Sequence, residues 1–543
     1  MDYLKKHLKS KRNIAACVAA LVHWVVTFFT DHLCFEALPG EGVAADFAAL
    51  PSDGRLHFVL CKLILLALLI FIWGFIFDII KGICSGGFRE WFEDKSGREE
   101  AGCINKAVIF KYMLIYFLPI IAVLIFKLPE GFLSNDESLI FAEASALHTY
   151  TWFYYLTTYY YIVCMMLIPS WLGPVLVKVF LQLYVCGYTV YRLRSHTRDC
   201  RGYAAYFPFF IMPVLAYTTS AHRIPVYYLL YYLLFFRFFM DRLEKREIRL
   251  PSYILMCLCG AALTQWRTEG IYMLGLFPVL MFICYREKWA DKKRALLAII
   301  IFFVIEYLMT VPQNGLLAKR LSDQADNRMG PFWAYTVTNM YRNGLDMDEN
   351  RESLEMIWRY LNRDTLEAIN RDLGDINYED TLILYYPGYT GRIETAGDED
   401  YIAYVAGCKR LFTENIPVFI KTRIGAFKYA ALPYHISLEG LSIGAVCRFF
   451  FSIFKCLSYN LFLPCIFVLV ICGRAFIKRD WLVFFMGGGL ICHWLIVFVL
   501  APASYFKYYF PIYMCGWSVV LIYVGMKVIG LAASRLGKGQ RAS

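Results

Sequence analysis

Apolar runs recur along the whole chain, and short polar loops separate most of them. They occupy residues 14–30, 57–80, 107–126, 149–168, 171–191, 203–219, 223–240, 252–265, 270–285, 294–312, 443–472, 481–500 and 508–531. A helix needs about 20 apolar residues to cross the hydrocarbon of a bilayer. Because lipid cannot satisfy backbone polar groups, a crossing segment forms its own hydrogen bonds as a helix. The sequence therefore predicts an all-α polytopic membrane protein with about 12 transmembrane helices.

The composition excludes a soluble fold. Of the 543 residues, 59% are hydrophobic and 18% are charged, and the mean hydropathy is +0.48. Soluble domains are about 45–50% apolar and about 25% charged, and the same comparison excludes disorder and a small disulfide scaffold. The net charge of +11 is spread over many short loops, as in membrane proteins. We therefore expect no nucleic-acid partner.

The charges of the loops predict the orientation of the chain. Basic residues gather in the loops 192–202, 241–250, 286–294 and 474–480 and in the C-terminal tail, whereas the loops 31–56 and 127–148 are acidic. Cytoplasmic loops carry an excess of Lys and Arg. The basic loops and both termini are therefore expected inside the cell, and the acidic loops outside.

Two segments decide how many crossings the chain makes. The basic N-terminus and the run 14–30 resemble a signal peptide, but the run is long and no small-residue cleavage site follows, which favours a retained span. If 149–168 and 171–191 both cross, the basic loop at 192 lies outside, which contradicts the excess of Lys and Arg expected in cytoplasmic loops. One of the two runs is therefore not expected to cross fully. Because residues 149–161 are rich in Trp and Tyr, we expect an interfacial segment there.

The chain has one long polar segment, residues 313–442, and it is acidic whereas the rest of the chain is basic. It is long enough for a small domain, and residues 351–372 show helical spacing of apolar side chains. The expected division is a transmembrane module at 1–312 with a catalytic outward loop at 127–148, a mostly helical extracytoplasmic domain at 313–442, and C-terminal helices with a cytoplasmic tail at 443–543.

Four groups of polar residues fall at the outward ends of the predicted spans. An ionisable side chain costs about 2.5–3.5 kcal/mol at the centre of a bilayer and less near its surface. Each group also has a purely structural explanation: a helix cap, a capped turn, an internal ion pair, or a lysine that extends to the interface. Because all four fall at one depth, we predict one site there. The groups are Asp136, Glu137, Glu143 and His148; His222 and Arg223; Arg267 and Glu269; and Tyr505 and Lys507.

Two of these motifs resemble those of the GT-C superfamily of membrane glycosyltransferases, such as protein O-mannosyltransferases and lipid-A aminoarabinose transferases. Residues 135–138, Asn-Asp-Glu-Ser, are similar to the acidic motif of the first outward loop. Residues 505–511 are similar to the Arg-Tyr…Pro pattern that opens a late span, although Lys507 stands where Arg is more usual. The layout, with a large outward segment flanked by late spans, is also similar.

The resemblance implies transfer of a sugar from a polyprenyl-phosphate carrier to an acceptor at the extracytoplasmic face. Asp136 would be the catalytic base, supported by Glu137, and a positioned base contributes about 10²–10⁴ in rate. Arg223, Arg267 and Lys507 would bind the donor phosphate and stabilise the charge of the leaving group. The other substrate-binding positions would be Glu143, His148, His222, Glu269 and Tyr505.

Two other functions stay open on the sequence: a transporter or flippase of a lipid-linked or anionic substrate, and a glycan polymerase or ligase. The expected partners are a polyprenyl-phosphate-linked sugar and membrane lipid, in a bacterial cytoplasmic membrane. No metal-ligating set and no certain cofactor are assigned. The resemblance leaves a divalent cation possible, although the turn at 220–223 lacks the second carboxylate found in several related families.

Overall fold

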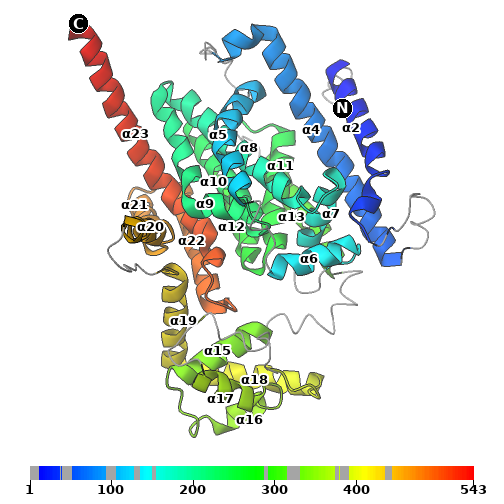
Figure 1. The fold of residues 1–543 in the computed structure, drawn as a ribbon, viewed down its shortest axis with the longest axis vertical. Coiled ribbons are helices and arrows are strands. Elements are labelled where there is room, and N and C mark those ends of the chain that lie inside the picture. The colour runs from blue at the N-terminus through cyan, green and yellow to red at the C-terminus, as the bar shows by residue number, and fades with distance from the viewer. Residues whose placement is uncertain are drawn as a thin grey trace. The chain divides into compact units, whose positions relative to one another are not determined.

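A computed structural model describes residues 11–36, 38, 50, 52–92, 105–127, 135–149, 154–285, 292–314, 330–372, 378, 391–434 and 443–542. These residues are mostly helical, as predicted (Figure 1), and one isolated antiparallel bridge pairs Leu361 with Arg392. The chain forms two compact units. Unit 1 comprises Met1–Gly315, Ile471–Met486 and Met514–Ser543, and unit 2 comprises Leu316–Val470 and Gly487–Tyr513. The three-part division expected from the sequence stays a prediction.

The helices follow one another closely along the chain. The first part contains α2 (Lys11–Thr27), η1 (Asp31–Leu33), α4 (Ser52–Phe92), α5 (Lys106–Lys127), α6 (Asn135–Ser145), α7 (Tyr155–Leu167), α8 (Gly173–Thr197), η3 (Cys200–Phe210), α9 (Met212–Thr218), α10 (Ile224–Leu243), α11 (Leu250–Trp266), η4 (Thr268–Tyr272), α12 (Met273–Tyr285) and α13 (Lys292–Asn314). The second part contains α15 (Gly330–Arg342), α16 (Arg351–Ile357), α17 (Arg363–Asp372), α18 (Asp398–Glu414), α19 (Ile416–Ala431), α20 (Ile443–Ser458), α21 (Phe462–Ile477), α22 (Trp481–Leu500), η7 (Phe506–Tyr509) and α23 (Phe510–Ala542).

Eight helical segments of the described chain are long and apolar enough to cross a membrane. They are Gly54–Cys84, Lys106–Phe126, Gly173–Thr197, Ile224–Leu243, Thr268–Tyr285, Val446–Ile477, Trp481–Leu500 and Phe506–Ser534. Four shorter apolar helices are Arg12–Thr27, Tyr155–Leu167, Leu250–Trp266 and Leu296–Pro312. These segments coincide with every predicted run except 203–219, which forms η3 and α9. The multi-pass character is supported, and the count of 12 crossings stays a prediction.

Helices α8 and α10 run side by side in the same direction (Figure 1). Lys178 in the first turns of α8 contacts the carbonyl of His222, just before α10. Arg192 near the end of α8 contacts Asp241 near the end of α10. Parallel neighbours need a connection that returns along their length, and η3 with α9 provides it. This explains why residues 203–219 are apolar without forming one long helix.

Helix α7 is too short to cross alone. At 1.5 Å per residue, its 13 residues rise about 20 Å, against about 30 Å of hydrocarbon. Its tyrosines contact the ends of helices that the predicted orientation places outside. The contacts are Tyr159 with His57, Tyr160 with Pro174, Tyr161 with Ala221 and Tyr155 with Met309. The interfacial segment expected at 149–161, and a single crossing by α8, stay predictions.

The runs 252–265 and 270–285 form a helical hairpin, α11–η4–α12, which turns at residues 267–272. Gly270 occupies its turn, where a Cβ atom would lie 2.0 Å from the carbonyl oxygen of Leu263. Only glycine lets the turn approach α11 this closely. The break therefore has a steric cause in addition to its charged residues.

In unit 2, helices α15 to α18 gather around one apolar core (Figure 1). Leu354, Ile357, Leu361 and Leu366 are all buried in it, which confirms the helical spacing predicted for 351–372. The segment forms two helices rather than one. Helix α16 ends at Ile357, Leu361 pairs with Arg392 in the isolated bridge, and α17 begins at Arg363. The run 443–472 is likewise divided into α20 and α21.

Candidate functional site

Glu137 joins two of the four predicted groups. It lies in the first turn of α6 and is completely buried. Its Oε2 is 3.1 Å from Nδ1 of His222, and its Oε1 is 3.3 Å from Nη1 of Arg223. The backbone amide of Arg223 also donates to Oε1, at 3.4 Å, across a sequence separation of 86 residues. We call these three residues the Glu137 cluster.

The turn that carries His222 and Arg223 is held from two further helices. Lys178 in α8 is only 1% exposed and donates hydrogen bonds to the carbonyl oxygens of Ser220 and His222. The hydroxyl of Tyr161 in α7 donates to the carbonyl of Ala221 at 2.7 Å. Lys178 lies in an apolar run, and the sequence leaves its direction open. The structure shows that it fixes the backbone of the turn.

The cluster presents a histidine that a buried carboxylate orients. The His222 side chain is 21% exposed, whereas the Glu137 side chain is fully buried. A carboxylate at Nδ1 favours the tautomer with its proton there and turns Nε2 away from the carboxylate. Arg223 balances the charge of Glu137. This arrangement suits His222 to accept a proton and Glu137 to position it, a division of roles that differs from the catalytic role predicted for Glu137.

The third group forms an ion pair within the turn η4. Nη2 of Arg267 lies 2.5 Å from Oε1 of Glu269, and both side chains are mostly buried. Thr268 donates to the other oxygen of Glu269 at 3.2 Å. Tyr227, one helical turn beyond Arg223 in α10, lies within electrostatic reach of Glu269. The ion pair that the sequence suggests as a structural explanation is therefore present.

The remaining predicted residues lie elsewhere in the chain. The side chain of Asp136 is outside the described part. Glu143 and His148 follow Glu137 along and just beyond α6, with side chains about 40% exposed and 4.0 Å apart. Tyr505 and Lys507 belong to unit 2, where Nζ of Lys507 lies 4.8 Å from the centre of the Tyr505 ring. The roles predicted for these residues stay predictions.

Glu306 is a buried carboxylate that the sequence analysis did not single out. It lies in α13 and is 6% exposed. Its Oε1 accepts hydrogen bonds from Thr264 at 2.6 Å and from Gln265 at 2.9 Å, and its Oε2 has no hydrogen-bond partner among the described residues. A lone acid within the apolar run 294–312 is the signal that marks it in the sequence. Its donors lie directly before the Arg267–Glu269 turn.

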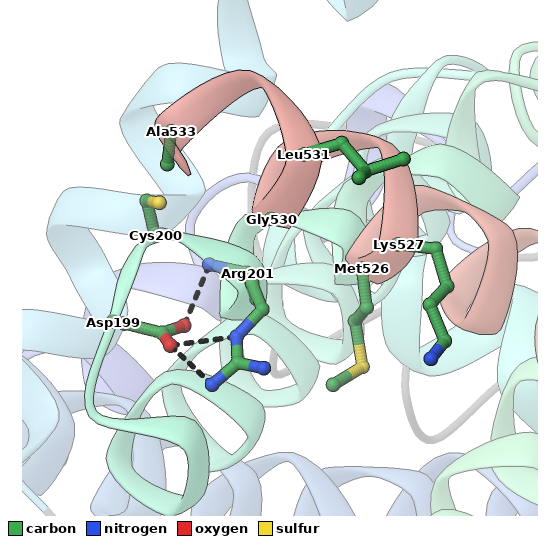
Figure 2. A pocket seen from close by; sticks show the side chains of 8 residues that line it. All are labelled: Asp199, Cys200, Arg201, Met526, Lys527, Gly530, Leu531 and Ala533. Carbon is green, nitrogen blue, oxygen red and sulfur yellow. Dashed lines mark hydrogen bonds and ion pairs between the residues drawn. The ribbon is translucent and has the colours of Figure 1, made fainter. Parts of the chain in front are cut away.

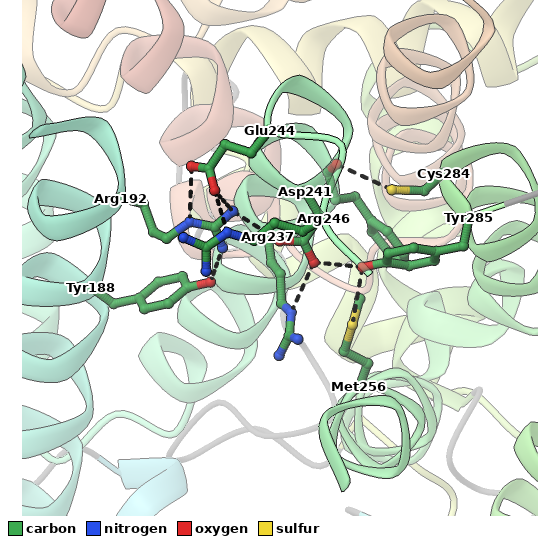
Figure 3. Close-up of polar contacts among 10 residues, drawn as sticks. Tyr188, Arg192, Arg237, Asp241, Glu244, Arg246, Met256, Cys284 and Tyr285 are labelled. Carbon is green, nitrogen blue, oxygen red and sulfur yellow. Dashed lines mark hydrogen bonds and ion pairs between the residues drawn. The ribbon is translucent and has the colours of Figure 1, made fainter. Parts of the chain in front are cut away.

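A second buried ionic network lies at the opposite ends of α8 and α10 (Figure 3). Nη2 of Arg192 lies 2.8 Å from Oδ1 of Asp241 and 3.1 Å from Oε2 of Glu244, and the Arg192 side chain is 1% exposed. Arg237 lies 3.4 Å from Asp241, Arg246 lies 2.5 Å from Glu244, and Tyr285 of α12 donates to Asp241 at 2.6 Å. These contacts tie three helices together, which is a structural role.

A buried ion pair joins the end of α2 to α4. After α2, Asp31 is buried beside Lys62 of α4, at 2.7 Å, and burial raises the pKa of Asp31 to about 6 although Lys62 acts in the opposite direction.

An open pocket of about 410 Å³ lies between η3 and α23 (Figure 2). Asp199 and Arg201 form an ion pair on one side of it, and Lys527 and Leu531 line the other. The pocket contains none of the predicted site residues.

Among the described residues, no group of three or more His, Cys, Asp or Glu side chains has the arrangement of a metal site. Comparisons with known protein families, with curated proteins and with solved structures find no significant match to this chain. The chemistry of the site must therefore be argued from its own residues.

Proposed function

We propose that the chain is an integral-membrane glycosyltransferase, which moves a sugar from a polyprenyl-phosphate carrier to an acceptor at the extracytoplasmic face. One observation carries this proposal: in a chain of membrane-type helices, a carboxylate, a histidine and an arginine from two distant segments meet at one turn. Ionisable residues are rare in membrane segments and usually serve function. Transfer to a hydroxyl needs a base, and a phosphate leaving group needs cations.

In this proposal His222 is the base. It takes the proton of the acceptor hydroxyl while the acceptor oxygen bonds to the anomeric carbon of the sugar. The bond between that carbon and the carrier phosphate breaks, and its electron pair leaves with the phosphate. Glu137 holds the His222 ring in place through its contact with Nδ1. Arg267, in the same unit as His222, is the proposed partner of the donor phosphate.

The test is transfer from a polyprenyl-phosphate sugar in liposomes. His222→Gln removes the base and should lower the rate by about 10²–10⁴. The matched control is His196→Gln, because His196 is exposed near the other end of α8. Glu137→Gln should also lower the rate, since Gln keeps the shape but loses the carboxylate that orients the ring.

The same assay separates the two candidate bases. If His222→Gln is fully active and Asp136→Asn is inactive, Asp136 is the base, as the acidic motif predicts. If neither change affects transfer, the base lies outside this region of the chain. If the wild type forms no glycosidic bond from any polyprenyl-phosphate donor, the proposed function is wrong.

Glu306 favours the transporter as the second candidate function. A carboxylate within an apolar helix is typical of proton-coupled transport, and Glu306 has such a position. Uptake or flipping of a labelled anionic lipid into liposomes, measured with and without a pH gradient, tests this function. Transport that Glu306→Gln uncouples from the gradient would support it over transfer chemistry.

A further inference from the structure

Arg423 in α19 is among the largest fully buried side chains of the described chain, and only 1% of its surface is exposed. Its Nε donates to the carbonyl oxygen of Phe498 at 2.6 Å, and its Nη2 donates to that of Ala501 at 2.9 Å. Both carbonyls belong to the C-terminal end of α22, where orphan carbonyls carry partial negative charge. Part of the role of Arg423 is therefore to cap α22.

The cap leaves one edge of the guanidinium unused. A guanidinium has five N–H donors in a planar fork, and the two contacts with α22 occupy the edge formed by Nε and Nη2. Nη1 is buried and has no hydrogen-bond partner among the described residues. The described residues also contain no carboxylate paired with Arg423. Burial lowers the pKa of Arg423, and the neighbouring Tyr335 and Tyr509 act in the opposite direction.

Tyr335 lies beside this guanidinium, and Ser504 lies beside Tyr335. The ring of Tyr335 in α15 is centred 5.9 Å from the Arg423 guanidinium carbon, and its hydroxyl lies near Ser504. Ser504 follows Ala501 by three residues, in the turn that leads to η7. Both hydroxyls are buried, and neither makes a hydrogen bond of normal geometry in the described structure.

An unpaired buried polar group costs about 1–3 kcal/mol. Three such groups in one place, all able to donate and one of them charged, are best satisfied by an anionic oxygen ligand. We propose that Arg423, Tyr335 and Ser504 form an oxyanion-binding site in unit 2, which binds a phosphate group. Ser504 immediately precedes Tyr505 in the chain, so the site lies next to residues 505–507 in the sequence. The proposal stands on these donors alone and does not depend on the transferase chemistry.

The experiment measures phosphate binding by the full-length protein in detergent. Equilibrium dialysis with radiolabelled inorganic phosphate is one arm, and binding of a polyprenyl phosphate in mixed micelles is the other. Saturation in the first arm indicates a free phosphate ligand, and saturation in the second arm alone indicates a lipid headgroup. Either result supports an oxyanion site, provided that the variants below weaken it.

Tyr335→Phe and Ser504→Ala remove one donor each and leave the α22 cap intact. Each should weaken binding about 10–100-fold, as expected for loss of one hydrogen bond to a charged group. The matched control is Tyr404→Phe, which removes another buried hydroxyl of unit 2 that donates to the carbonyl of Gly330. It should bind phosphate as the wild type does.

Arg423→Lys keeps a positive charge but loses the fork, and it should weaken binding more than either hydroxyl variant. If this variant does not fold, the two hydroxyl variants still decide the question. Unchanged affinity in both of them, or no saturable binding of either probe to the wild type, would overturn the proposal and leave Arg423 as a helix cap only.

Discussion

Replacing Arg192 with methionine tests whether the buried network of Figure 3 holds unit 1 together. Methionine keeps most of the volume and removes the charge. Arg192 is 1% exposed and contacts Asp241 and Glu244 at 2.8 and 3.1 Å. Removing one partner of a buried ion pair costs about 3–5 kcal/mol, because it leaves the other charge unpaired.

The remaining contacts place the expected value within that range. Asp241 keeps Arg237 at 3.4 Å, and Glu244 keeps Arg246 at 2.5 Å, so neither carboxylate loses every cation. We therefore expect Arg192→Met to lower the free energy of unfolding by about 3 kcal/mol, at the lower end of the range. Tyr285→Phe loses one hydrogen bond to Asp241 and should cost about 1.5–3 kcal/mol.

The assay is denaturant-induced unfolding in mixed micelles, followed by helical circular dichroism. Arg201→Met is the matched control, because Arg201 also pairs with an aspartate just beyond α8, but its side chain is 50% exposed. Exposed pairs contribute about 0–1 kcal/mol. If Arg192→Met is no more destabilising than this control, the network does not stabilise the helix pair and the reasoning is refuted.

Three further predictions concern single residues. Burial raises the pKa of Asp31 from 3.8 to about 6, so the folded state binds its proton more tightly than the unfolded chain. This contribution of about 3 kcal/mol is present below about pH 4 and is lost as the pH rises through about 6, and Asp31→Asn should remove it from a plot of Tm against pH; an unchanged plot contradicts the argument. Glu306→Leu strands two buried donors and should cost about 1–3 kcal/mol of unfolding free energy, whereas Glu306→Gln should cost less, and the reverse order in thermal melts would contradict the contacts. Gly270→Ala should destabilise the hairpin because its Cβ would lie 2.0 Å from a carbonyl oxygen, whereas Gly275→Ala in α12 meets nothing within 4 Å and should be neutral; equal melting temperatures would show that the turn relaxes.

The Glu137 cluster shows which feature of the site cannot be predicted from the sequence, namely which side chains are in contact. The sequence places Glu137, His222 and Arg223 at one predicted depth, but depth alone does not tell which side chains touch. That depends on which helices are neighbours and on how each is rotated about its axis. Lys178 and Glu306 illustrate the same limit, since each is visible as a charge in an apolar run while its partner lies on another helix.

Hydropathy and the spacing of residues by themselves determine that this chain is a helical, multi-pass type of protein with a helical polar segment. These features follow from local physics, because a run of apolar residues must satisfy its own backbone in lipid. Only the tertiary structure decides that Glu137 orients His222, and that Arg423 caps α22 with one edge of its guanidinium left over. Arg423 lies in a polar region where an arginine is unremarkable in sequence, and its burial arises only from the packing of α15, α19 and the end of α22 around it.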